Sequence, residues 1–146
     1  MSFSDFVTPC GKRINKEHFI HLVQVSRADG KIQPSEFELL HKEGRKFGLT
    51  DPEIDRIIEK ESKRHYDPPY SLHEKFDQLY NIVEIVLADN EVSEAEMKLI
   101  NRYAIEAGFD DKTIPKLVDL LVKGVREGKD EEILLKEFRK KHLFAD

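Results

Sequence analysis

The fold of this chain can be inferred by starting from residues 28–40, which have the sequence ADGKIQPSEFELL. From Asp29 onward the stretch matches the second half of a calcium-binding EF-hand loop, with an acid followed directly by glycine and a closing glutamate at Glu36. The first half does not match, because its leading ligand positions fall on Val25 and Arg27, which carry no carboxylate. The sequence therefore argues against a complete EF-hand and predicts a tight turn between two helices.

The same pattern returns sixty positions later in the chain. The segment LVQVSRAD at residues 22–29 aligns without a gap with IVEIVLAD at residues 82–89, and the alignment continues through both following helices. The matched pairs include Asp29 with Asp89, Glu36 with Glu96, Gly48 with Gly108 and Ile54 with Ile114. A repeat that keeps loop, core and helix-end residues in one register predicts two three-helix units related by a pseudo-twofold axis, each covering the other's apolar face.

Helix start and stop signals divide the chain in the same way. Pro34 and Gly48 bound one predicted helix, and Ser71–Glu74 and Ser93–Glu96 fit capping boxes that open two others. We expect an all-α fold of about seven helices in a single domain spanning 1–146. Its parts are repeat 1 (about 15–64), a proline-stiffened linker (65–70), repeat 2 (about 71–127) and a C-terminal helix (about 130–142).

Apolar periodicity predicts which residues of these helices face the core. On the second helix the expected inward residues are Phe37, Leu40 and Phe47, and on the last helix they are Ile133, Leu134 and Phe138. The basic segment 136–144 could also bind a partner or an acidic membrane surface, but its apolar residues favour a helix that docks on the domain.

Composition excludes several classes of protein. A chain of 146 residues with a net charge of −5 and interspersed charges lacks the basic stripe of a nucleic-acid binder. No apolar run is long enough for a transmembrane segment, and the first residues lack the apolar core of a signal peptide. Cys10 is the single cysteine, which points to a reducing compartment, so we expect a cytoplasmic protein.

The repeated acids Asp29, Glu36, Asp89 and Glu96 are the candidate metal ligands. If the two loops meet, four carboxylates converge, and their repulsion requires a hard cation such as Ca²⁺, Mg²⁺ or Mn²⁺, or a basic partner. The structural interpretation is equally open: each aspartate accepts hydrogen bonds within its turn, and each glutamate caps the helix that follows.

The segments RADGKIQPSEFELLHKEGRKFGLT and LADNEVSEAEMKLINRYAIEAGF resemble the repeated A-D-G-x-[IV]-x-x-x-E segments of the TerB-like family, which is linked to tellurite resistance in bacteria. The resemblance spans about residues 15–125. It implies an all-α, two-unit fold, an acidic face with the four acids above, and a non-enzymatic role in metal-ion or stress response through protein partners, including membrane-associated ones. The second copy departs from the pattern, with Asn90 in place of glycine.

Other constellations give weaker signals. His18 and His21 lie three apart on one predicted helix, but a surface pair is favoured over a metal pair because no third ligand lies near in the sequence. Cys10 has no identifiable base, and no phosphate-binding loop or nucleophile elbow occurs.

The leading hypothesis is therefore a non-enzymatic TerB-like module that binds a divalent cation through its paired acidic loops. The alternative is a metal-free scaffold that recruits a protein through its acidic surface. A metalloenzyme is a third hypothesis, but the sequence shows no recognisable general base for it. The sequence leaves the oligomeric state open.

Overall fold

The computed structural model describes residues 5–7, 13–26, 32–89 and 91–140. This part of the chain contains seven α-helices, which are α1 (Lys16–Ser26), α2 (Pro34–Lys46), α3 (Asp51–Glu61), α4 (Leu72–Val86), α5 (Glu94–Glu106), α6 (Ile114–Arg126) and α7 (Glu131–Phe138). A 3₁₀ turn, η1 (Leu87–Asp89), continues α4. The predicted all-α class and the seven helices are confirmed.

A short antiparallel hairpin before α1 was not predicted. Its strands are β1 (Asp5–Val7) and β2 (Arg13–Asn15), and Phe6 pairs with Ile14 in their register. Strands of three residues are too short for the alternation of apolar and polar positions to be recognised in a sequence. The hairpin is an addition to a helical fold and does not change its class.

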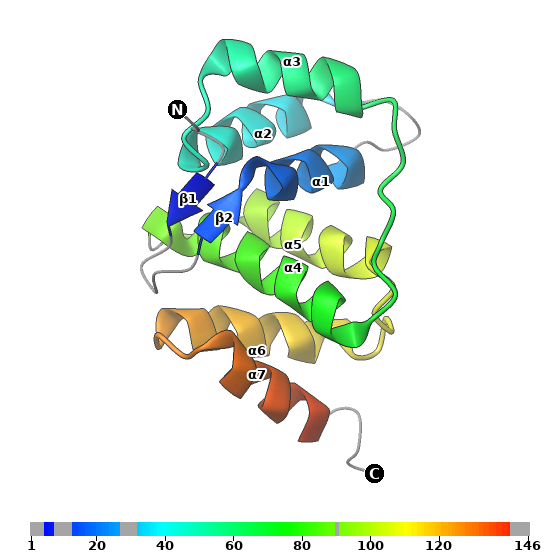
Figure 1. The fold of residues 1–146 in the computed structure, drawn as a ribbon, viewed down its shortest axis with the longest axis vertical. Coiled ribbons are helices and arrows are strands. Elements are labelled where there is room, and N and C mark those ends of the chain that lie inside the picture. The colour runs from blue at the N-terminus through cyan, green and yellow to red at the C-terminus, as the bar shows by residue number, and fades with distance from the viewer. Residues whose placement is uncertain (1–4, 8–12, 27–31, 90, 141–146) are drawn as a thin grey trace.

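The helices stack in three tiers along the long axis of the molecule (Figure 1). The tier at one end holds α1, α2 and α3, the middle tier holds α4 and α5, and the tier at the other end holds α6 and α7. α1 contacts both helices of the middle tier, and α6 contacts both from the opposite side. Because α4 is covered on several sides, residues 79–87 are buried without interruption.

The helix bounds of the two halves match at the repeat distance. α2 and α5 each span 13 residues and begin sixty positions apart, and α1 and α4 end sixty positions apart. Gly48 (φ 86°) and Gly108 (φ 93°) follow α2 and α5 in the left-handed conformation that commonly ends a helix. The match is lost at the third helices, because α3 begins at Asp51 whereas α6 begins at Ile114.

The capping signals are largely confirmed. Ser93 Oγ accepts a hydrogen bond from the Glu96 N–H (3.1 Å), and the Glu96 carboxylate accepts one from the Ser93 N–H (2.9 Å), which completes the predicted box. For the box at Ser71, the structure shows the half in which Ser71 Oγ accepts from the Glu74 N–H at 3.1 Å.

Two residues predicted to face the core do not. Phe37 is 39% exposed and Ile133 is 50% exposed. Phe37 lies in the first turn of α2 and stacks on the His41 ring, with 4.9 Å between the ring centroids. Ile133 falls beside the buried stripe of α7, which follows the helical period through Leu134 and Phe138. The other four predicted core residues of these helices are buried.

Candidate functional site

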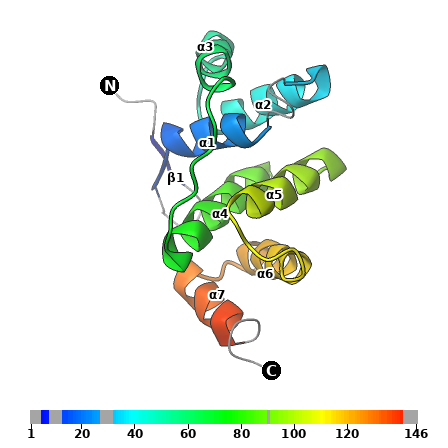
Figure 2. The same cartoon turned by 90° about the vertical axis from the view of Figure 1, so that its right-hand side faces the viewer.

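The first turns of α2 and α5 border one groove of about 650 Å³. Figure 2 shows both helices beginning on the same side of the molecule. The groove lies over Leu39 of α2 and Leu99 of α5, and its polar lining includes Glu36, Glu94 and Lys98. The equivalent turns of the two halves, which carry the repeated glutamates, therefore lie side by side.

Glu36 and Glu96 cap their own helices. Glu36 Oε1 accepts a hydrogen bond from the Gln33 N–H at 3.0 Å, as Glu96 Oε1 does from the Ser93 N–H. A carboxylate in this position satisfies a backbone donor that the helix leaves open and meets the positive end of the helix dipole. The structural interpretation of these two glutamates is confirmed.

Glu96 differs from Glu36 because it is completely buried and also binds two lysines of α2. Lys46 Nζ donates to Glu96 Oε2 at 2.8 Å, and Lys42 Nζ donates to Oε1 at 3.2 Å. Burial alone would raise the pKa of Glu96. Hydrogen bonds from Glu43, the two lysines and the Ser93 N–H outweigh burial and hold this pKa well below its usual range.

Lys46 connects three parts of the structure. Besides Glu96 of α5, its Nζ donates to the Val86 carbonyl oxygen of α4 at 2.9 Å and lies 3.6 Å from Asp89 Oδ2 of η1. Burial would lower the pKa of Lys46, but the hydrogen bond to Glu96 and the nearby carboxylates raise it above its usual value. Lys46 is therefore an ammonium ion, and it brings α2 onto the second half of the chain.

Glu43 completes this cluster and was not predicted. It is completely buried, and neither of its carboxyl oxygens accepts a hydrogen bond from the described residues. Burial, followed by the hydrogen bond that its protonated form gives Glu96, raises the pKa of Glu43 to about 9 against the attraction of Lys46. Its position was visible in the sequence, since it lies between Leu40 and Phe47 on the apolar stripe of α2.

The predicted metal ligands are only partly brought together. Asp29 lies outside the described residues. Asp89 and Glu96 approach the same Lys46, whereas Glu36 borders the groove and caps α2. Within the described ranges, no group of three or more His, Cys, Asp or Glu side chains is arranged to hold a metal ion. The four-carboxylate metal site stays a prediction.

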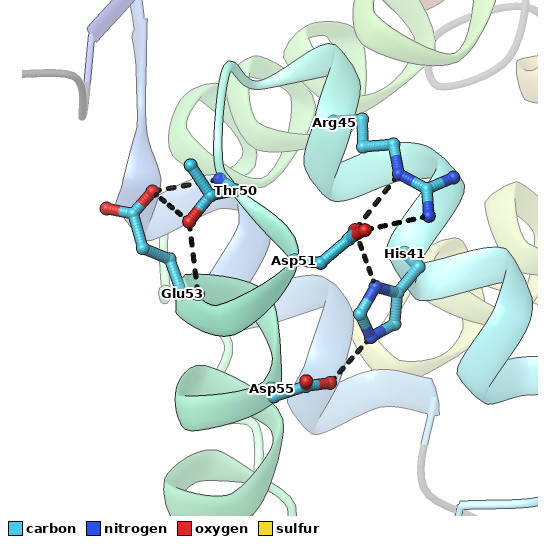
Figure 3. Close-up of polar contacts among 6 residues, drawn as sticks. All are labelled: His41, Arg45, Thr50, Asp51, Glu53 and Asp55. Carbon is cyan, nitrogen blue, oxygen red and sulfur yellow. Dashed lines mark hydrogen bonds and ion pairs between the residues drawn. The ribbon is translucent and has the colours of Figure 1, made fainter.

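A second polar cluster joins α2 to α3 (Figure 3). His41 Nδ1 lies 3.0 Å from Asp51 Oδ1, and His41 Nε2 lies 2.7 Å from Asp55 Oδ1. Arg45 donates to both oxygens of Asp51, and this bond, with the one from His41, lowers the pKa of Asp51. The dashed contacts in Figure 3 join His41 and Arg45 of α2 to Asp51 and Asp55 of α3, so the cluster ties these two helices together.

The histidines of α1 contact different parts of the structure. His18 Nε2 lies 3.3 Å from Asn81 Nδ2, whereas the His21 ring packs against Tyr66 of the linker, with centroids 5.3 Å apart. Tyr66 in turn donates its O–H to Gln78 at 2.7 Å, which fixes the linker on the domain. Burial lowers the pKa of His21. These contacts favour structural roles over a shared metal.

Comparison with known proteins assigns no identity to the chain. No family model, no curated protein and no solved structure matches it. In the described residues, no helix combines the length and apolar character that crossing a bilayer requires.

Proposed function

We propose that this protein is a non-enzymatic binding module that holds a segment of a protein partner in the groove between the starts of α2 and α5, without a metal ion. The observation that carries the proposal is the groove itself. Its volume of about 650 Å³ lies within the range of roughly 300–1,000 Å³ that is typical of binding sites. It is also the place where the repeated turns of both halves meet.

The lining of the groove defines the chemistry of the partner segment. Leu39, Leu99 and Ala95 offer apolar surface, Glu94 lies at the start of α5, and Lys98 follows one turn later. A complementary segment carries an apolar side chain with a basic group on one side and an acidic group on the other. Glu96, in the same turn of α5, does not line the groove and is already paired with Lys46.

The resemblance to the TerB-like family and the repeat agree with this proposal. We take the chain as two three-helix units, about 15–64 and 71–127, related by a pseudo-twofold axis. The equal lengths and matched starts of α2 and α5 support this arrangement. A groove between equivalent turns is then a product of the duplication, and a role in metal-ion or stress response follows from the resemblance alone.

Selection from a random peptide library against the intact protein tests the proposal. Selected peptides are measured by fluorescence anisotropy against the native protein and two variants. Ala95→Trp fills the groove from an exposed position, and Glu132→Trp places the same side chain at the equivalent exposed position of α7. We expect Ala95→Trp to weaken binding by about tenfold or more, which is about 1.4 kcal/mol, and Glu132→Trp to leave it unchanged. Equal binding to all three proteins would reject the groove.

A second candidate is the cation site predicted from the repeat, made by Asp29, Glu36, Asp89 and Glu96. The observation in its favour is that Asp89 and Glu96 approach one positive group. Calorimetric titration of Ca²⁺, Mg²⁺ and Mn²⁺ into metal-free protein and into the Glu36→Gln/Glu96→Gln pair tests it. Saturable binding that the double variant loses would favour the cation site over the metal-free module.

A further inference from the structure

The Lys46 ammonium lies among more oxygen atoms than it can satisfy. Four oxygens from four elements surround Nζ, and we call them the oxygen cage: Glu96 Oε2 at 2.8 Å, the Val86 carbonyl at 2.9 Å, Glu43 Oε1 at 3.5 Å and Asp89 Oδ2 at 3.6 Å. An ammonium has three N–H donors. Two of these contacts have hydrogen-bond length. Asp89 forms an ion pair at longer distance, and the neutral Glu43 carboxyl lies 3.5 Å away without a hydrogen bond to Nζ.

The burial of Glu43, which is one of the four groups of the oxygen cage, gives a second indication that the cage is suited to a cation. It is completely buried, and neither of its oxygens accepts a hydrogen bond in the described structure. A buried carboxyl without a donor is unfavourable, and such groups call for a partner. Glu43 Oε1 lies 3.5 Å from Lys46 Nζ and accepts no hydrogen bond from it, so this buried oxygen faces the cation with its acceptor position open.

We propose that the oxygen cage is a cation-binding site occupied from within the chain by Lys46, which thereby excludes divalent ions of the Mg²⁺, Ca²⁺ and Mn²⁺ class from the native protein. All donors in the cage are oxygens, and three belong to carboxyl groups, which is the donor set that these ions prefer. The side chain of Lys46 is only 12% exposed, and its covalent attachment gives the ammonium a high effective concentration.

The present dimensions of the cage explain why it is closed to metal ions. Metal–oxygen bonds of this class measure about 2.0–2.6 Å, whereas the cage holds its oxygens 2.8–3.6 Å from Nζ. The carboxyl groups of Glu43 and Asp89 would have to move inward to bind a metal. They can do so only when the ammonium is absent. Asp89 has room to move, because its side chain is 45% exposed.

The test compares Mn²⁺ binding to the native protein, Lys46→Ala and Lys42→Ala. Lys42 also donates to Glu96 but is absent from the cage, so Lys42→Ala is the matched control. We expect Lys46→Ala to bind Mn²⁺ at least about tenfold more tightly than the other two proteins. At about one hundred times Kd, Mn²⁺ should raise its unfolding midpoint by roughly 5–10 °C, with NaCl at equal ionic strength as the reference.

Two further variants keep the test decisive. Lys46→Met retains most of the apolar stem and replaces Lys46→Ala if that protein does not fold. Adding Glu43→Gln to the Lys46 variant should abolish the gain in Mn²⁺ binding, because the buried ligand is lost. The proposal is overturned if the Lys46 variant binds Mn²⁺ no better than Lys42→Ala, or if native protein binds it equally well. Neither result decides whether the groove holds a peptide, because that test uses peptides and the Ala95→Trp variant; Mn²⁺ binding by the native protein would bear only on the statement that the module works without a metal ion.

Discussion

Replacement of Glu43 by glutamine should stabilise the protein, and the gain should depend on pH. In the unfolded chain this carboxyl has the ordinary pKa of 4.5, whereas in the folded protein burial raises its pKa to about 9. Between these values the unfolded state releases a proton that the folded state retains, so the native protein loses stability as pH rises. Each pH unit costs about 1.36 kcal/mol, which amounts to about 3 kcal/mol at pH 7. Glutamine keeps the shape and an N–H donor for Glu96 but has no proton to lose.

Urea denaturation at pH 5, 6, 7 and 8 measures this difference directly. The unfolding free energy of Glu43→Gln should exceed that of the native protein by less than about 1 kcal/mol at pH 5 and by about 3 kcal/mol at pH 7, with a further increase at pH 8. Glu59→Gln makes the same chemical change at an exposed position of α3 and should shift stability by no more than about 0.5 kcal/mol. A difference that stays constant with pH would refute the assignment of a neutral, buried Glu43.

Three further predictions concern the helix junctions. Lys46→Ala in metal-free buffer should lower the free energy of unfolding by about 2 kcal/mol at pH 7. Because pairing with Lys46 holds the pKa of Glu96 low, the stability that this pair gives is present above about pH 4.5 and is lost on acidification. The difference between the two proteins, measured by urea denaturation, should therefore shrink as the pH falls toward the native pKa of Glu96. Gly44→Ala would place a Cβ 2.6 Å from Ile54 Cδ1 and 3.2 Å from Phe19 Cζ, so thermal unfolding should show a loss of stability of about 1–3 kcal/mol. A gain in stability would mean that α3 moves away freely. Thr50→Ala should lower the free energy of unfolding by about 1 kcal/mol, because Thr50 Oγ1 accepts a hydrogen bond from the Glu53 N–H at the start of α3. Denaturation followed by circular dichroism measures this loss, and an unchanged midpoint would contradict it.

Much of the fold could be predicted because local signals and global packing agree. Capping residues, helix-ending glycines and apolar stripes located all seven helices, and the ungapped repeat correctly placed the starts of α2 and α5 at equivalent positions. The errors occur where the local signal is short or its context is missing. β1 and β2 have three residues each, and Phe37 lies at a helix start, where its ring meets His41 instead of the core.

The candidate site was harder to predict because the repeat conceals its asymmetry. At the repeat distance Glu43 aligns with Tyr103, and Lys46 aligns with Glu106, so the second half contains no copy of the buried pair. Glu36 and Glu96 align and both cap a helix, yet Glu96 alone is fully buried and binds lysines. Symmetry could identify the acids, but the lysine that reaches Asp89 and Glu96 comes from a helix about fifty residues away in the chain. Long-range pairing of this kind leaves no periodic pattern.

Lys46, and not a metal ion, is the cation bound by Asp89 and Glu96. A crystal structure of the native protein soaked in Mn²⁺, with anomalous data collected for manganese, tests this most directly. We expect no anomalous peak beside Glu43, Asp89 and Glu96, with Lys46 Nζ still bonded to Glu96 and to the Val86 carbonyl. A manganese peak between Asp89 and Glu96, with the Lys46 side chain displaced, would contradict it.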